Sequence, residues 1–197
     1  MITVFKGIKH DHVLVFDAEY NEGSLIQFAG ILFRKIEKDI FQIERSLTIY
    51  VKLEEGEINR FIRDFTGITD SFLNTFGVTL AEAKEEIEQL VNVEADSMLV
   101  VSHGITNDRR ILFDNGVNLY YDKNERDIEG ICTYNAAKRL LKRDKRLTLT
   151  DVAAESGIYL SNGHNAFEDA WATVSVFCLM CKLEEENKNE KILQSGK

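Results

Sequence analysis

Three apolar segments near the start of the chain have the composition of β-strands. His12–Tyr20 is apolar up to its carboxylates, which is typical of a central strand covered on both faces. Ser24–Arg34 and Phe41–Lys52 are rich in Ile, Leu, Val and aromatic residues, and turn-like or charged residues separate the three segments. The pattern predicts an antiparallel meander of three strands.

Farther along the chain the apolar positions follow a helical spacing, interrupted by one short strand candidate. Thr79 and Glu82 have the spacing of a capping box and precede apolar residues at helical intervals, which predicts a helix from Thr79 to Val93. Met98–Ser102 is a candidate buried strand. Further helices are predicted over Asp108–Asn115, Thr133–Arg143, Thr150–Ser156 and from Ala166 onward. Strands followed by α-β-α units predict an α/β fold with a mixed sheet flanked by helices.

The composition of the chain fits a single globular domain. With 197 residues and 44% hydrophobic content, the chain is long enough to bury a core, and we expect one domain over 1–183. The last residues, 184–197, are charged and lack aromatics, and we expect a frayed helix end or a disordered tail. No apolar stretch reaches membrane-spanning length, and three cysteines are too few for a disulfide framework. We therefore expect a soluble, cytoplasmic protein without a membrane partner.

The net charge of −9 argues at first against a nucleic-acid partner, because most such proteins carry basic patches that replace counterions on the phosphates. The objection is weaker for an enzyme whose clustered carboxylates are neutralised by divalent cations. One segment, 138–146, holds six of the 24 basic residues. It could follow a phosphate backbone, or it could be a solvated helix face.

Two carboxylates end the first apolar strand. Asp17 and Glu19 share one face with Val15, because strand side chains alternate. Burying two carboxylates there costs several kcal/mol unless a cation compensates them. The same spacing at Asp127 and Glu129 falls in a polar stretch, where a solvated surface pair is the better interpretation. Context therefore singles out Asp17 and Glu19 as candidate metal ligands.

Two further fragments complete the candidate site. His164 lies just before a predicted helix and Asp169 in its first turns, so both can face one cleft; the alternative is a surface histidine beside a helix-start acid. His12 and Asp17 have the same spacing, but in a strand their side chains point to opposite faces. Asp108 follows the Met98–Ser102 strand and opens the next predicted helix. Taken alone, Asp108 is only a favourable first-turn acid.

These residue types suit the hydrolysis of a phosphodiester. The reaction needs a nucleophilic hydroxide and stabilisation of the departing oxygen, and two divalent cations supply both. Mg²⁺ and Mn²⁺ prefer carboxylate oxygens, so four acids suit them. The histidine is then free to accept the proton of the attacking water. The set predicts a metal-dependent nuclease.

In this order, the fragments Phe16-Asp-Ala-Glu19, His103-Gly-Ile-Thr-Asn-Asp108 and His164-x-x-x-x-Asp169 resemble the DEDDh branch of the DnaQ-like 3′-to-5′ exonucleases, and the similarity extends over nearly the whole chain. The resemblance implies a ribonuclease H-like fold with a mixed five-stranded sheet, in which the meander is joined by parallel strands. It also implies two Mg²⁺ or Mn²⁺ ions and the release of nucleoside 5′-monophosphates from single-stranded 3′ ends.

The resemblance further assigns roles to individual residues. Asp17 would bridge both ions, Glu19 and Asp169 would hold the nucleophile-side ion, Asp108 would serve the leaving-group side, and His164 would be the general base. The implied substrate-binding residues are Tyr20, Asn21, Thr66, His103 and Asn107. Among the aromatic residues, we expect Tyr20 to stack on a base, and Phe65 and Phe72 to pack under a loop.

The segment before Asp108 departs from the family pattern, because it lacks the usual Asn and Phe that frame the terminal nucleotide. Asn59–Thr69 is more similar to KapD-like and small-RNA-trimming members, and Asp108–Leu112 is similar to oligoribonuclease, which favours RNA over DNA. Three alternatives stay open: a DNA proofreading or repair exonuclease, an endonuclease on the same fold, and a non-catalytic module that binds nucleic acid or a partner. The oligomeric state and any polymerase partner are not specified by the sequence.

Overall fold

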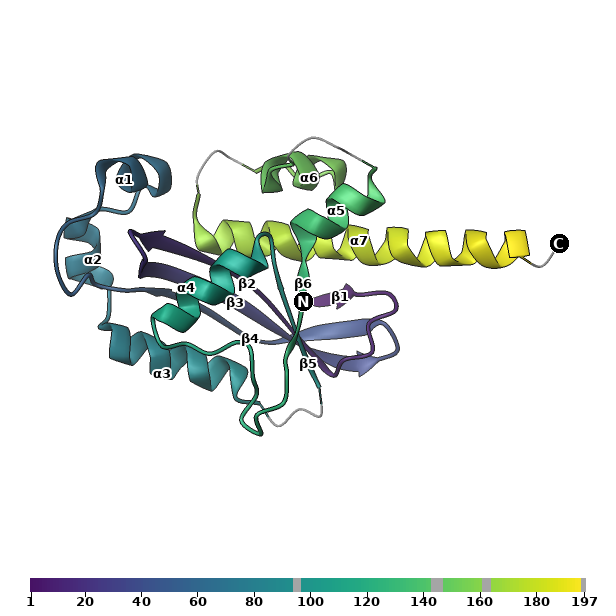
Figure 1. Cartoon of the computed structure of the whole chain (residues 1–197), viewed down its shortest axis with the longest axis horizontal. Coiled ribbons are helices and arrows are strands. Elements are labelled where there is room, and N and C mark those ends of the chain that lie inside the picture. Colours follow the sequence, from purple (N-terminus) through teal and green to yellow (C-terminus); the bar gives the residue numbers. More distant parts are fainter. Residues whose placement is uncertain (94–96, 143–146, 161–163, 196–197) are drawn as a thin grey trace.

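The centre of the protein is a six-stranded sheet in the order β1-β4-β3-β2-β5-β6, seen in a computed structural model that describes residues 1–93, 97–142, 147–160 and 164–195 (Figure 1). The strands are β1 (Ile2–Val4), β2 (His12–Asn21), β3 (Ser24–Glu37), β4 (Ile40–Tyr50), β5 (Met98–Ser102) and β6 (Glu129–Cys132). As predicted, β2, β3 and β4 form an antiparallel meander, and β5 and β6 continue the sheet in parallel register. The expected count of five strands was wrong for the described residues. The additional strand is β1, which at three residues is too short to show an alternating pattern.

Seven helices surround this sheet in the part of the chain that the structure describes. They are α1 (Arg60–Thr66), α2 (Asp70–Phe76), α3 (Leu80–Val91), α4 (Ile105–Asp114), α5 (Thr133–Leu140), α6 (Leu149–Glu155) and α7 (Ala166–Ser195). Among the described helices, none combines the length and apolar character needed to cross a membrane.

Two expectations about helices need correction. Asp108 does not open α4, because the helix begins three residues earlier, after Gly104. The boundary at 184 stays a prediction; α7 runs through this position to Ser195 and extends past the sheet (Figure 1). Helices α1 and α2 were not predicted at all; α1 buries none of its residues and α2 buries Leu73 alone, so neither shows an apolar stripe.

The alternation of side chains along β2 builds the two faces of the core. Leu14 and Phe16 belong to a cluster with residues of α3 and α4, whereas Val13 and Val15 belong to a cluster with residues of α7. The sheet is therefore covered on both faces, as the apolar composition of β2 predicted. Asp17 continues the face of Val15, and so lies on the side of α7.

Helix caps and a hydrogen bond to Asn21 place the short helix α1 beside the end of β2. The Asn59 side chain accepts a hydrogen bond from the Phe61 backbone N–H, and Gly67 ends α1 with a left-handed φ of 75°. The Asn21 side chain, at the end of β2, accepts a hydrogen bond of 2.8 Å from the Asn59 backbone. These contacts fix α1 beside the end of β2 (Figure 1).

Candidate active site

The three sequence fragments converge at one edge of the sheet. Because β2 and β5 are parallel neighbours, their carboxyl ends lie together, and the loops and helices that follow them meet there. A cleft of about 860 Å³ opens at this point. It is lined by the five predicted site residues Asp17, Glu19, Asp108, His164 and Asp169, together with Tyr20, Phe61, Phe65, His103, Asn107, Tyr134 and others.

Asp17 and Glu19 face the start of α7. Asp17 is paired across the sheet with Ala29, and Glu19 with Gln27. The buried Gln27 side chain accepts a hydrogen bond of 3.1 Å from the Ala166 backbone N–H, which ties the first turn of α7 to the strand beside Glu19. The strand next to the one that carries two of the acids, β3, therefore helps to place the helix that carries the fourth.

The pKa values of these two carboxyl groups are raised. Burial is the largest cause for Asp17, and the charges of Asp108, Asp169 and Glu19 add to it. Burial, followed by the charges of Asp169 and Asp108, raises the pKa of Glu19 to about 7. Asp17 thus feels all three other acids, which agrees with a central position among them.

Asp108 enters the cleft from the first turn of α4. It is 9% exposed, and the Ser102 hydroxyl at the end of β5 donates a hydrogen bond to its carboxylate. Burial raises the pKa of Asp108, and the hydrogen bond from Ser102 opposes that increase. Ser102 was missed in the sequence, although a serine that ends an apolar strand is a usable signal for a buried polar contact.

Asp169 and His164 approach from the beginning of α7. Burial, followed by the charge of Glu168, raises the pKa of Asp169 to about 7. The His164 Nδ1 atom lies 3.9 Å from the Asp169 Oδ2 atom. One potential ligand atom each from Glu19, His164 and Asp169 lies within 4.8 Å of the others, a spacing that suits a shared cation. Burial lowers the pKa of His164, which favours a neutral imidazole.

The arrangement fits divalent cations because no basic side chain described in the cleft neutralises the four acids. No Lys or Arg lines the cleft within the described ranges, so burial and mutual repulsion raise the pKa values of the carboxyl groups, opposed at Asp108 by the hydrogen bond from Ser102. Four carboxylates are a hard oxygen donor set, which suits Mg²⁺ or Mn²⁺.

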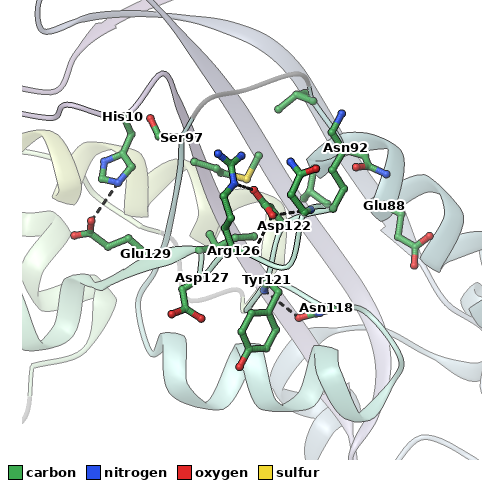
Figure 2. Close-up of a pocket in the computed structure, with 16 residues that line it drawn as sticks. His10, Glu88, Asn92, Ser97, Asn118, Tyr121, Asp122, Arg126, Asp127 and Glu129 are labelled. Atoms are coloured by element: carbon green, nitrogen blue, oxygen red, sulfur yellow. Dashed lines mark hydrogen bonds and ion pairs between the residues drawn. The ribbon is translucent and has the colours of Figure 1, made fainter.

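A second pocket, of about 410 Å³, lies near the start of β5 and shows a different charge pattern (Figure 2). Its His10 Nε2 atom lies 3.1 Å from the Glu129 carboxylate, and its Arg126 Nε atom lies 2.6 Å from the Asp122 carboxylate. Two acids of this pocket are thus paired with basic side chains, unlike the acids of the cleft. The contrast supports the cleft, and not this pocket, as the cation site.

The predicted substrate-binding residues divide into two groups. Tyr20, His103 and Asn107 line the cleft. Asn21 and Thr66 do not, because they hold α1: Asn21 contacts the backbone before the helix, and the Thr66 hydroxyl donates to the Ile62 carbonyl over 2.9 Å.

Phe65 does not pack under a loop as predicted. It is 41% exposed, lines the cleft and lays its ring against His164, with ring centroids 3.4 Å apart and an angle of 15° between the planes. Phe72 does pack, with its ring edge-on to Tyr50 at 4.7 Å. The mistake about Phe65 follows from the missed helix α1, whose caps Asn59 and Gly67 were the available signal.

Part of the basic segment and of the last motif cannot be placed. Residues 143–146 and 161–163 lie outside the described residues, and the described part of the basic segment is 138–142. There, Arg139 forms an ion pair of 2.8 Å with Glu184 on α7.

Comparison with known proteins places these features in context. The family model for Exonuclease (RNase_T) matches residues 13–177. A search of curated proteins found no match.

Solved structures with the same fold include exonucleases bound to nucleic acid. Escherichia coli exonuclease I in complex with a dT13 oligonucleotide is 19% identical, with a TM-score of 0.70 over 91% of this chain and 43% of that chain. The zinc-bound form of the E. coli exonuclease I–single-stranded DNA complex gives 20% identity and a TM-score of 0.68, over 91% and 42%. A 3′-exonuclease, described as recognising the 3′ end of the histone mRNA stem-loop, is 17% identical. Its TM-score is 0.63, over 88% of this chain and 82% of that chain. The chain thus spans less than half of the exonuclease I chains that it matches.

Proposed function

Because the chain belongs to the Exonuclease (RNase_T) family, we propose that it is a two-metal-ion 3′-to-5′ exonuclease that releases nucleoside 5′-monophosphates from single-stranded ends. The predicted relation to DnaQ-like exonucleases, the ribonuclease H-like fold and the class of enzyme, a metal-dependent nuclease, are confirmed. The observation that carries the proposal is the convergence of four carboxylates in a cleft without a compensating Lys or Arg among the described residues.

The proposed roles follow the positions of the acids. Asp17, which feels the charges of the other three, would contact both ions. Glu19 and Asp169 each have a potential ligand atom within 4.8 Å of the other and of one on His164, and they would hold the nucleophile-side ion. Asp108 would serve the leaving-group side. When bound, the ions lower the pKa of a water molecule and neutralise charge on the departing oxygen.

His164 would act as the general base in this scheme. Its lowered pKa keeps the imidazole neutral, so that a ring nitrogen can accept the proton of the attacking water. Its side chain lines the cleft and is 47% exposed, so it would be accessible to a bound substrate end.

We propose RNA as the favoured substrate, with DNA as the alternative. The support is the altered segment before Asp108, in which His103 and Asn107 line the cleft. The His103 Nδ1 atom lies 2.9 Å from the Thr133 hydroxyl, so this ring is held by its surroundings. Related structures concern both histone mRNA and DNA oligonucleotides, so the fold accommodates either sugar. A cytoplasmic location stays an expectation from the sequence.

The experiment is a side-by-side assay on 5′-labelled single-stranded RNA and DNA of one sequence, with Mn²⁺ and with EDTA. We expect ladders that shorten from the 3′ end, faster on RNA, and no product in EDTA. Ladders on DNA alone would reject the RNA preference. A 3′-labelled substrate should lose a labelled mononucleotide first, whereas internal fragments would identify an endonuclease.

A matched pair of variants links the activity to the site. Asp17→Asn should abolish degradation in Mn²⁺ while the protein stays folded by circular dichroism. Asp127→Asn changes the aspartate of the second Asp-x-Glu pair, in the pocket of Figure 2, and should leave activity unchanged. Oligonucleotide binding without hydrolysis by the wild-type protein would favour the non-catalytic alternative.

A further inference from the structure

The stacked pair Phe65 and His164 joins two segments that are far apart in the sequence. Phe65 lies near the end of α1, and His164 lies just before α7. The ring centroids are 3.4 Å apart and the planes are nearly parallel, at 15°. The His164 side chain is 47% exposed, so the Phe65 ring covers one of its faces and leaves much of the rest open.

The Phe65 side of this contact is the better anchored. The Asn59 backbone N–H donates to Asn21 over 2.8 Å, and the Ile58 backbone N–H donates to the Asp70 carboxylate, also over 2.8 Å. The Thr66 hydroxyl bonds within the helix. By contrast, the only hydrogen-bonding or charged contact recorded for His164 in the described part of the chain is the 3.9 Å approach to Asp169. Because Phe65 is held in place and His164 is less constrained, the Phe65 ring determines the position of the His164 ring.

A general base must be held within hydrogen-bond reach of the proton that it accepts. Rotation of an exposed imidazole about its side-chain bonds would carry its nitrogens away from the acids. A stacked phenyl ring resists that rotation, because it requires the imidazole plane to stay parallel to it. The imidazole edge then stays near Glu19 and Asp169, with potential ligand atoms within 4.8 Å.

We propose that Phe65 is a positioning residue for hydrolysis, which acts by holding the His164 imidazole beside the metal-binding carboxylates. The inference rests on the proposed function, in which His164 is the general base. It differs from a direct role in substrate binding, which the more exposed Phe61 could fulfil. Phe61 is 68% exposed and stacks on Phe65, with ring centroids 5.6 Å apart.

The contact itself can be tested without activity, by proton NMR of the histidine rings. The face of Phe65 should shift the His164 ring protons upfield, and a His164→Gln variant assigns these signals among the four histidines. Phe65→Leu should abolish the upfield shift and Phe65→Tyr should keep it. Unchanged His164 signals in Phe65→Leu would overturn the proposal.

The consequence for catalysis is tested by steady-state kinetics on a labelled oligonucleotide in Mn²⁺. Phe65→Leu should lower kcat by about tenfold or more with KM nearly unchanged. A small displacement of a catalytic group slows the chemical step much more than it weakens substrate binding. Phe65→Tyr should restore kcat. The control is Phe76→Leu, which removes a more exposed ring, at 66%, from α2, outside the cleft, and should have no effect.

A double-mutant cycle separates positioning from substrate contact. In a His164→Gln background, Phe65→Leu should cause no further loss, because the group that it positions is gone. An equal loss in both backgrounds would show that Phe65 acts on the substrate or the fold, and would overturn the proposal. Failure of the proposed function is a separate result: Asp17→Asn would then keep wild-type hydrolysis, whatever Phe65 does.

Discussion

At the scale of single residues, the site is a set of carboxyl groups that the metal-free protein holds against their preference for water. Burial raises the pKa of both Glu19 and Asp169 to about 7, and it also raises that of Asp17. Such groups bind a proton more tightly in the folded than in the unfolded chain. The same property prepares them for a divalent cation, which replaces the proton as the compensating charge.

The metal-free protein should therefore lose stability as the pH rises. The contribution of Glu19 to the free energy of unfolding is fully present below its ordinary pKa of 4.5, and is lost as the pH rises through about 7. In EDTA, the melting temperature should be lower near pH 8 than near pH 5. Excess Mn²⁺ near pH 8 should restore it, because the ion binds only the folded site.

Glu19→Gln supplies the control for this prediction, since it removes one titrating group without a large change in shape. Its melting temperature in EDTA should depend less on pH than that of the wild-type protein. Equal pH dependence of the two proteins would mean that Glu19 is not the strained group. Thermal unfolding followed by circular dichroism is a sufficient measurement.

At the scale of elements, the short helix α1 decides what borders the cleft. It carries both Phe61 and Phe65, and it ends at Gly67 with a φ of 75°. A Cβ atom added at Gly67 would meet nothing within 4 Å, so a substitution there strains only the backbone. This makes the C-terminal cap of α1 a selective handle on the helix.

Gly67→Ala should destabilise α1 by about 1 to 2 kcal/mol, the cost of a left-handed conformation for a residue with a Cβ atom. Amide hydrogen exchange in α1 should become faster, whereas exchange in the distant α3 should not change. Gly67→Asn should have a smaller effect, because asparagine tolerates this conformation. Equal exchange in wild-type and Gly67→Ala proteins would show that the cap does not limit the opening of α1.

The contrast between β2 and α1 shows what the sequence could and could not reveal. The apolar run of β2 and the alternation of its side chains were enough to predict that Asp17 and Glu19 lie on one face. Helix α1 has no buried residue, so it has no apolar stripe to recognise. Its position depends on the Asn21–Asn59 contact, a tertiary interaction that local patterns do not contain.

The convergence of the distant acids was predictable only in part. The order of the motifs and their context indicated that Asp108 and Asp169 belong to the same site as Asp17 and Glu19. Asp108, however, was expected to open its helix, which begins at Ile105. The buried Gln27, which ties α7 to β3, gave no sequence signal, because a glutamine in an apolar strand has many possible partners. Contacts between side chains and backbone across elements were thus the missing information.

At the scale of the whole molecule, the net charge of −9 opposes the approach of a polyanion. The acids of the cleft contribute to that repulsion until cations bind. An end of single-stranded nucleic acid should therefore bind the cleft weakly in the absence of divalent cations. The basic segment 138–146 is the competing location for affinity, and its described Arg139 is already paired with Glu184.

Binding of a fluorescent single-stranded oligonucleotide should accordingly depend on divalent cations. With the Asp127→Asn control and the wild-type protein, anisotropy in Ca²⁺ should give an affinity at least about tenfold higher than in EDTA, because cations in the cleft remove local repulsion and attract the phosphates. Asp17→Asn should reduce this difference, since it removes the carboxylate that feels all the others. Equal affinity in Ca²⁺ and EDTA would place the dominant contact outside the cleft, and exchanging Lys138 and Lys142 for Gln would then test the basic segment. Because hydrolysis requires the 3′ end to reach the carboxylates, only a cation-dependent affinity is consistent with a cleft that binds its substrate through the ions.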